Sequence, residues 1–209
     1  MDTQERTRTR RREAISPRAN RRFGGGMTGN ERLTAIAGAV LIVLLAIEGA
    51  TIPFLGGLLT VHIFVGMLLL GPVALKLAST GYRAARYYGH SPEYVRGGPP
   101  APAMRFFVAP VLVFSTLTLF GTGVALIAFG RVGPLSLLHK ASFIVWVGVM
   151  SIHVLVYAVR AARRVVADIS RDRVGGAALR QVLVLASLGA GLVVALLTLP
   201  IAEHWRHHH

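Results

Sequence analysis

The chain has 209 residues, of which 53% are hydrophobic and only 15% charged, and its mean hydropathy is +0.56. The apolar residues form runs of about 20, long enough to cross a hydrocarbon core about 30 Å thick. This pattern excludes a soluble domain and predicts an all-α integral membrane bundle. The chain contains no cysteine, which excludes disulfides, thiolate metal sites and c-type haem attachment.

Basic residues outnumber acidic ones by 23 to 9, so nucleic acid has to be considered as a partner. These residues lie in the N-terminal region and between the apolar runs, where the positive-inside rule places them. The distribution favours contact with anionic lipids over nucleic-acid binding. We therefore expect the lipid bilayer, and no nucleic acid, as a partner.

Residues 1–32 contain nine arginines and a Gly-Gly-Gly stretch but no apolar run. A segment of this composition buries too little surface to fold, so a disordered cytoplasmic tail is predicted, with anionic lipids at its basic residues. A cleaved signal peptide is less favoured than an uncleaved first span, because the basic region is long.

Five apolar segments follow, and each is long enough to span a membrane as a helix, the form that satisfies its own backbone hydrogen bonds in lipid. They cover about 33–53, 58–79, 105–129, 135–159 and 178–200, and a short external tail at 201–209 follows them. Pro53 and the Gly56-Gly57 pair indicate the first turn. Pro72 and Pro110 lie inside segments and would kink their helices.

Orientation follows from the distribution of Lys and Arg. The tail, the 80–105 loop and the 160–180 loop carry 9, 4 and 6 of them, which is 19 of the 23 in the chain. The positive-inside rule therefore places the N-terminus in the cytoplasm and the C-terminus outside, in a multi-pass protein of the cell (plasma) membrane. The 80–105 loop is interpreted as an interfacial connector, or as a docking surface for a cytoplasmic partner or anionic lipid.

Two histidines of the fourth segment, His139 and His153, lie fourteen positions apart. In an α-helix this spacing advances about 21 Å and ends roughly 40° short of four full turns, so both side chains lie on nearly one face. The second segment repeats the spacing with His62 and Lys76. Because both helices run inward, His62 matches His139 in depth, and Lys76 matches His153.

Two imidazoles at one depth on separate spans are what a bis-His haem b site requires, because low-spin haem iron takes one axial ligand on each face. We therefore expect one haem b with His62 and His139 as axial ligands, and Gly66 to let the macrocycle approach the backbone. Lys140 or Arg131 would contact a propionate. Zinc or copper is less favoured, since no carboxylate or thiol neighbours these histidines in sequence.

The second pair, His153 and Lys76, contains only one histidine. A second haem bound by His153 would need Lys76 as a deprotonated amine; alternatively, Lys76 extends to the interface or pairs with a propionate. Glu48 is the one carboxylate within a predicted span. It would accept a hydrogen bond from a ligand imidazole, move a proton to or from a quinone or propionate, or close a helix contact in its protonated form.

The stretches VHIFVGMLLLGPVALK and LHKASFIVWVGVMSIHV resemble the small b-type membrane cytochromes, the broad cytochrome b561 and ferric-reductase-like group. The resemblance covers the second and fourth spans, and the other three match only in number and hydrophobicity. It implies a helical bundle that holds haem b and passes electrons across or into the membrane. By that resemblance His62 and His139 bind an outer haem, and His153 belongs to an inner one.

The leading hypothesis is a membrane-bound electron-transfer protein, or an oxidoreductase subunit, that exchanges electrons with quinone or a partner redox protein. No GxGxxG motif follows a predicted strand, so a separate donor would supply the electrons. The alternative is a non-catalytic accessory, scaffold or transport subunit with structural histidines, in which Gly189 and Gly191 form a face for a partner helix. A hydrolase is least supported, since neither G-x-S-x-G nor H-E-x-x-H occurs.

Overall fold

The computed structural model describes residues 26–98, 102–130, 132–170 and 176–207, with side chains except at 158–170 and 204–207. Within these ranges every regular element is helical and no strand occurs. The predicted all-α fold is therefore confirmed for the described part of the chain. The predicted disorder of residues 1–25 lies outside the described residues.

Five long helices make up most of the described chain. They are α2 (Gly26–Thr51), α3 (Leu55–Tyr88), α5 (Ala109–Phe129), α6 (Gly133–Ser170) and α7 (Ala177–His207). The shorter elements are the 3₁₀ turn η1 (Ile52–Phe54), the helix α4 (Pro92–Arg96) and the π-helical turn η2 (Met104–Val108).

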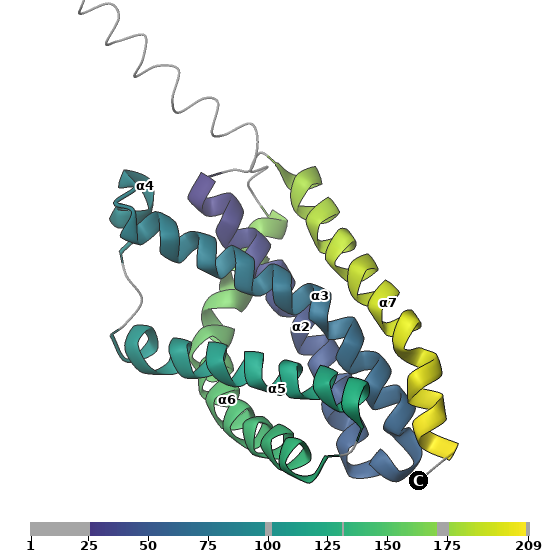
Figure 1. Ribbon diagram of the computed structural model, residues 1–209. Helices are drawn as coiled ribbons and strands as arrows, with labels where there is room; N and C mark the ends of the chain where they lie inside the picture. The colour runs from purple at the N-terminus through teal and green to yellow at the C-terminus, as the bar shows by residue number, and fades with distance from the viewer. Residues whose placement is uncertain (1–25, 99–101, 131, 171–175, 208–209) are drawn as a thin grey trace, which may run out of the picture.

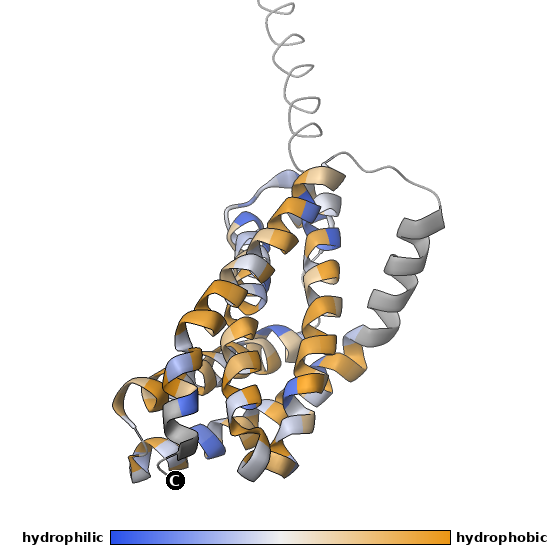
Figure 2. Cartoon of the chain, turned by 90° about the vertical axis from the view of Figure 1, so that its right-hand side faces the viewer, coloured by the Kyte–Doolittle hydropathy of each residue, from blue (hydrophilic) through white to orange (hydrophobic). Residues whose placement is uncertain are grey.

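Four helical stretches are long and apolar enough to cross a membrane. They are Gly26–Tyr88, Met104–Phe129, Gly133–Tyr157 and Ala177–Glu203. Hydrophobic residues predominate along the middle of these helices in the view of Figure 2, and hydrophilic ones are more frequent toward their ends. The chain is therefore a membrane protein with transmembrane helices.

The stretch Gly26–Tyr88 is a helical hairpin rather than one rod. Pro53 in η1 has no backbone donor, and Leu58 has non-helical dihedral angles of φ −111° and ψ 16°. The chain therefore reverses here, and α3 runs back along α2. The Asn30 side chain on α2 donates to the backbone oxygen of Ser79 on α3 at 3.0 Å. The turn predicted in this region is confirmed.

The helices extend beyond the predicted spans. α2 begins at Gly26, inside the predicted tail, and α7 continues to His207, inside the predicted external tail. α3 continues to Tyr88 and α6 to Ser170, inside two predicted loops. The helices are longer than the predicted spans because hydropathy marks only the lipid-buried part of a helix, whereas polar residues continue its backbone hydrogen bonds into water. The predicted disorder of residues 26–32 was wrong, since they belong to α2.

The five long helices form two groups. α3 packs against α2 and, most extensively, against α7, while α5 packs against α6; direct contacts between the two groups are few. Figure 1 shows α7 flanking α3 on one side of the molecule, and α5 and α6 on the other. The α2–α3 and α5–α6 connections lie at one end, which we name the turn end, and α4 lies at the opposite end, the α4 end.

The contact between α3 and α7 brings the two backbones together. A Cβ atom at Gly71 would overlap the backbone oxygen of Ser187, and one at Gly191 would overlap that of Leu68. Glycine is therefore required at both positions. Because Gly191 faces α3 of its own chain, the predicted face for a partner helix is wrong for this residue.

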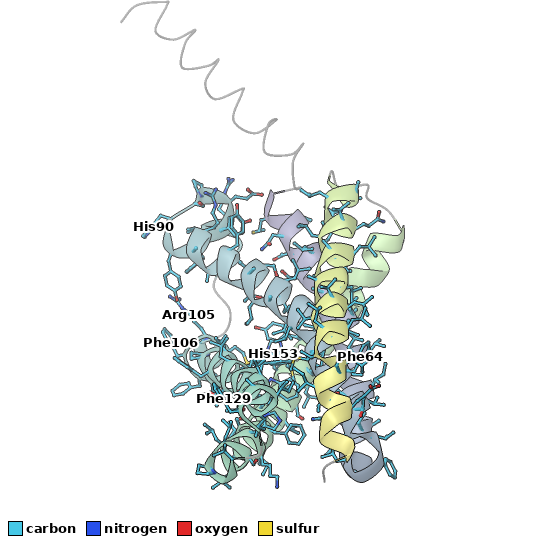
Figure 3. The ribbon with its side chains drawn as sticks, turned by 45° about the vertical axis from the view of Figure 1, so that its right-hand side comes forward. Phe64, His90, Arg105, Phe106, Phe129 and His153 are labelled. Atoms are coloured by element: carbon cyan, nitrogen blue, oxygen red, sulfur yellow. The ribbon has the colours of Figure 1, made fainter. Side chains whose placement is uncertain are left out.

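Aromatic and basic residues gather at the α4 end. Arg105 of η2 lies 4.7 Å from the ring centroid of Tyr88, and its Nε donates to the Tyr88 hydroxyl at 2.6 Å (Figure 3). Tyr94 of α4 packs edge-on against Tyr82, and burial raises the pKa of its phenol to about 12. Tyr and Arg side chains of this kind are typical of the headgroup level of a membrane.

Candidate functional site

A cavity of about 570 Å³ lies near the turn end, between the two helix groups. Its walls come from α2, α3, α5 and α6 and are mostly apolar. The polar side chains in the walls are Glu48, His62, Ser136, His139 and Lys140. Its volume lies within the range of about 300–1,000 Å³ found for small-molecule and cofactor sites.

His62 of α3 and His139 of α6 both line this cavity and are close enough to interact electrostatically. The sequence analysis predicts equal depths for these two residues on separate spans, and in the structure both line one cavity. Glu48 and Lys140 line the same cavity. The placement of Arg131 lies outside the described residues.

The His62 ring is held by two residues of α2. Its Nδ1 lies 3.0 Å from Glu48 Oε1 and 2.9 Å from Thr51 Oγ1. The Thr51 hydroxyl donates its one hydrogen to the backbone oxygen of Glu48 at 2.6 Å, so it can only accept from His62. Nδ1 therefore carries the ring hydrogen, and Nε2 keeps its lone pair for a ligand.

The His139 ring is held in the same way by α5. Its Nδ1 lies 3.1 Å from the backbone oxygen of Leu119 and 3.0 Å from Thr122 Oγ1. A carbonyl oxygen only accepts, and the Thr122 hydroxyl donates to the backbone oxygen of Thr118 at 2.7 Å. His139 therefore also carries its hydrogen on Nδ1. Both histidines leave the same nitrogen, Nε2, available.

Two glycines make room beside these groups. A Cβ atom at Gly123 of α5 would lie 3.3 Å from His139 Cε1, and one at Gly66 of α3 would lie 3.3 Å from Glu48 Oε1. Both glycines line the cavity. Sequence reasoning selected Gly66 from its place one turn after His62, but it missed Gly123, because nothing in α5 indicates which helix faces it.

Glu48 has one free carboxylate oxygen in this wall. Its Oε1 contacts His62, whereas Oε2 is buried and has no hydrogen-bond partner within the described part of the chain. Leaving a buried polar atom unpaired is costly, so such an atom calls for a donor or a functional explanation. Of the roles expected for Glu48, the hydrogen bond to a ligand imidazole has matching geometry.

Lys76 and His153 lie further toward the α4 end and do not line the cavity. Lys76 Nζ donates to the backbone oxygen of Thr34 on α2 at 2.6 Å. The His153 ring packs against Tyr157, with 4.8 Å between centroids, and the Lys76 charge reaches it. Lys76 and His153 thus lie within electrostatic range of each other, and a second haem at this place stays a prediction.

The fold and the cavity define a class, a helical membrane protein with a histidine-lined cavity of cofactor size between two helix groups. No protein-family model, curated protein or solved structure matches the chain. Across the described ranges, no group of three or more His, Cys, Asp or Glu side chains is placed to hold a metal ion. The cavity thus offers two imidazole nitrogens rather than a closed coordination sphere, and function has to be argued from this site.

Proposed function

We propose that the protein is a membrane-bound b-type cytochrome in which His62 and His139 are the axial ligands of one haem b. One observation carries the proposal: two imidazoles from separate helices line one apolar cavity, and each has its Nδ1 held and its Nε2 available. Bis-His haem iron takes one neutral imidazole on each face.

The other residues of the cavity fit a haem. The apolar wall suits a flat macrocycle, and Gly66 and Gly123 leave space beside the two ligands. Lys140 is exposed at the edge of the cavity, where an ammonium group would pair with a propionate. The sparse direct packing between the two helix groups is also what an interface filled by a cofactor would show.

When bound, haem b supplies a one-electron iron couple for exchange with quinone or a partner redox protein. The residues of this chain ligate, orient and bury it. Leu119 and Thr122 fix the His139 ring, and Thr51 and Glu48 fix the His62 ring. A carboxylate that accepts the Nδ1 hydrogen makes an imidazole a more basic ligand, which favours oxidised iron.

We infer five membrane crossings, with α2 and α3 each crossing once. The support is the length and apolar composition of the helices, together with the basic residues of the predicted cytoplasmic segments. If the protein lies in the plasma membrane, this topology places the N-terminus and the α4 end on the cytoplasmic side. The haem cavity then lies toward the outer surface, and anionic lipids contact the basic tail.

An optical spectrum tests the proposal. The full-length protein, purified after expression with sufficient haem, is expected to show a low-spin b-type spectrum on reduction. A pyridine haemochrome assay is expected to give one haem b per chain, or two if His153 binds a second. Colourless protein that is folded and monodisperse would contradict the proposal.

Replacement of Glu48 by glutamine tests the role of its charge. Glu48→Gln is expected to raise the midpoint potential of the haem by about 30–60 mV, which corresponds to a three- to tenfold change in the ratio of oxidised to reduced iron. Spectroelectrochemical titration measures this shift. Glu203→Gln, at an exposed carboxylate outside the cavity, is the matched control. Equal potentials in wild type and Glu48→Gln, with intact low-spin spectra, would exclude this role.

The alternative is a non-catalytic membrane subunit in which the histidines are structural. One observation favours it: the contact of His62 with Thr51 ties α3 to α2, and that of His139 with Leu119 ties α6 to α5. It predicts that alanine variants of both histidines lose thermal stability, while no form of the protein absorbs in the Soret region.

A further inference from the structure

A second polar cluster lies between α2, α3 and α6, toward the α4 end. On the α2–α3 side, the Thr34 hydroxyl donates to the Asn30 backbone oxygen at 2.8 Å and lies 3.0 Å from Ser79 Oγ. The Asn30 amide donates to the Ser79 backbone oxygen at 3.0 Å. These bonds satisfy the small polar groups and fix α2 against α3. The cluster then presents Lys76 from α3 and His153 from α6.

Lys76 brings a cation into this cluster, and no counter-ion lies beside it in the described part of the chain. An ammonium group has three donors, and the structure pairs one of them with the Thr34 backbone oxygen. Among the described residues no carboxylate lies within ion-pair distance of Lys76. Gly38 leaves space for the amine, since a Cβ atom there would lie 3.0 Å from Nζ. A charged side chain within a span that lacks a partner indicates a functional site.

His153, on α6 of the other helix group, lies within electrostatic range of Lys76. Within the described part of the chain, its ring forms no hydrogen bond, and its one ring contact is with Tyr157. Its nitrogens are thus available to a ligand, as are the two remaining donors of Lys76. His153 lies fourteen residues, or about 21 Å of helix, from His139, and Lys76 lies equally far from His62. The cluster is therefore separate from the haem cavity.

The chemistry of the cluster selects its ligand. Donors without partners call for oxygen acceptors, and a site inside a span is reached from lipid by a molecule that is itself apolar. A membrane quinone has a flat ring, two carbonyl oxygens and a lipid-soluble tail. A second haem would need Lys76 as an iron ligand, but its amine is directed to the Thr34 backbone oxygen.

We propose that Lys76 and His153 form a binding site for the headgroup of a membrane quinone, on the cytoplasmic half of the protein. Lys76 donates to a quinone carbonyl oxygen, and the His153 ring forms a second hydrogen bond to the headgroup. This inference rests on the proposed electron-transfer function, and it assigns the site at which the quinone that exchanges electrons with the haem binds.

Binding of 2-heptyl-4-hydroxyquinoline N-oxide, a fluorescent analogue of the quinone headgroup, tests the site. The full-length protein is titrated in detergent, and quenching of the probe is followed. We expect saturable binding at one site per chain, with competition by a short-tailed quinone. Lys76→Met and His153→Leu are each expected to weaken the binding about tenfold or more, because each removes a hydrogen bond to the probe. Ser151→Ala, exposed on α6, is the matched control and should bind as wild type does.

Two further measurements separate the outcomes. If Lys76→Met does not accumulate, Lys76→Gln retains a donor for the Thr34 oxygen, and weaker binding by this variant supports the site equally. The haem content of each variant is determined on the same sample.

Wild-type protein with haem that does not bind the probe, or variants that bind it unchanged, would overturn the quinone site and leave the cytochrome proposal standing. Absence of haem from wild-type protein would overturn the cytochrome proposal and this inference with it.

A fall from two haems per chain to one in His153→Leu would also overturn the quinone site, because it would assign the cluster to a second haem. Displacement of the probe by anionic phospholipid, but not by a quinone, would overturn it in favour of a lipid headgroup.

Discussion

Replacement of His62 or His139 by alanine is expected to reduce the haem b content of the purified protein at least tenfold. Each change removes one of the two proposed haem ligands, and the described lining of the cavity offers no further imidazole in its place. The protein that retains haem should shift from a low-spin to a high-spin spectrum. The ratio of Soret to protein absorbance, the haemochrome assay and electron paramagnetic resonance measure these effects.

Two comparisons make this result specific. His90→Ala, at an exposed residue of the α4 end, should leave the haem spectrum unchanged. Free imidazole should restore part of the low-spin spectrum of His139→Ala, because Gly123 and the removed ring leave a space at the ligand position. Wild-type spectra in both His62→Ala and His139→Ala would contradict the proposed ligands.

The predictable part of the fold is the part that lipid constrains. A hydrocarbon core requires long apolar helices, so their number and approximate position follow from composition alone. The same constraint allowed His62 and His139 to be paired, because an expected depth follows from the distance to the end of a span and the direction of the chain; both residues line one cavity. Neither inference requires knowledge of which helices are neighbours.

The contacts that complete the site can be predicted only if the neighbouring helices are known. Thr51 follows Glu48 by three residues, and both are within reach of His62 only because η1 turns α3 back along α2. Nothing in the sequence distinguishes Thr122 and Gly123 from other residues of an apolar helix. Their role becomes visible only when α5 is seen to pack against His139. Helix packing in lipid is set by small residues and a few polar groups, which leave a weak trace in a single sequence. The two-group arrangement of the helices was therefore not predicted.

The second large effect is expected at the backbone contact between α3 and α7. Gly191→Ala places a methyl group on the backbone oxygen of Leu68, which cannot rotate away, so α7 must move off α3. We expect a loss of about 2–3 kcal/mol in the free energy of unfolding, which corresponds to a fall of roughly 5–10 °C in Tm for a chain of this size. Gly71→Ala, at the opposing contact with Ser187, should act similarly.

Gly189→Ala supplies the control within the same helix. Gly189 is exposed, and no atom lies within 4 Å of the position that its Cβ would take. Alanine there should leave Tm unchanged or raise it slightly, because alanine favours a helix more than glycine does. Thermal unfolding of the three variants in one detergent, followed by circular dichroism, measures the difference. Equal Tm values for Gly189→Ala and Gly191→Ala would mean that α7 does not pack on α3 through Gly191. Because α3 carries His62, a loosened α7 should also lower haem retention in Gly191→Ala and leave it unchanged in Gly189→Ala.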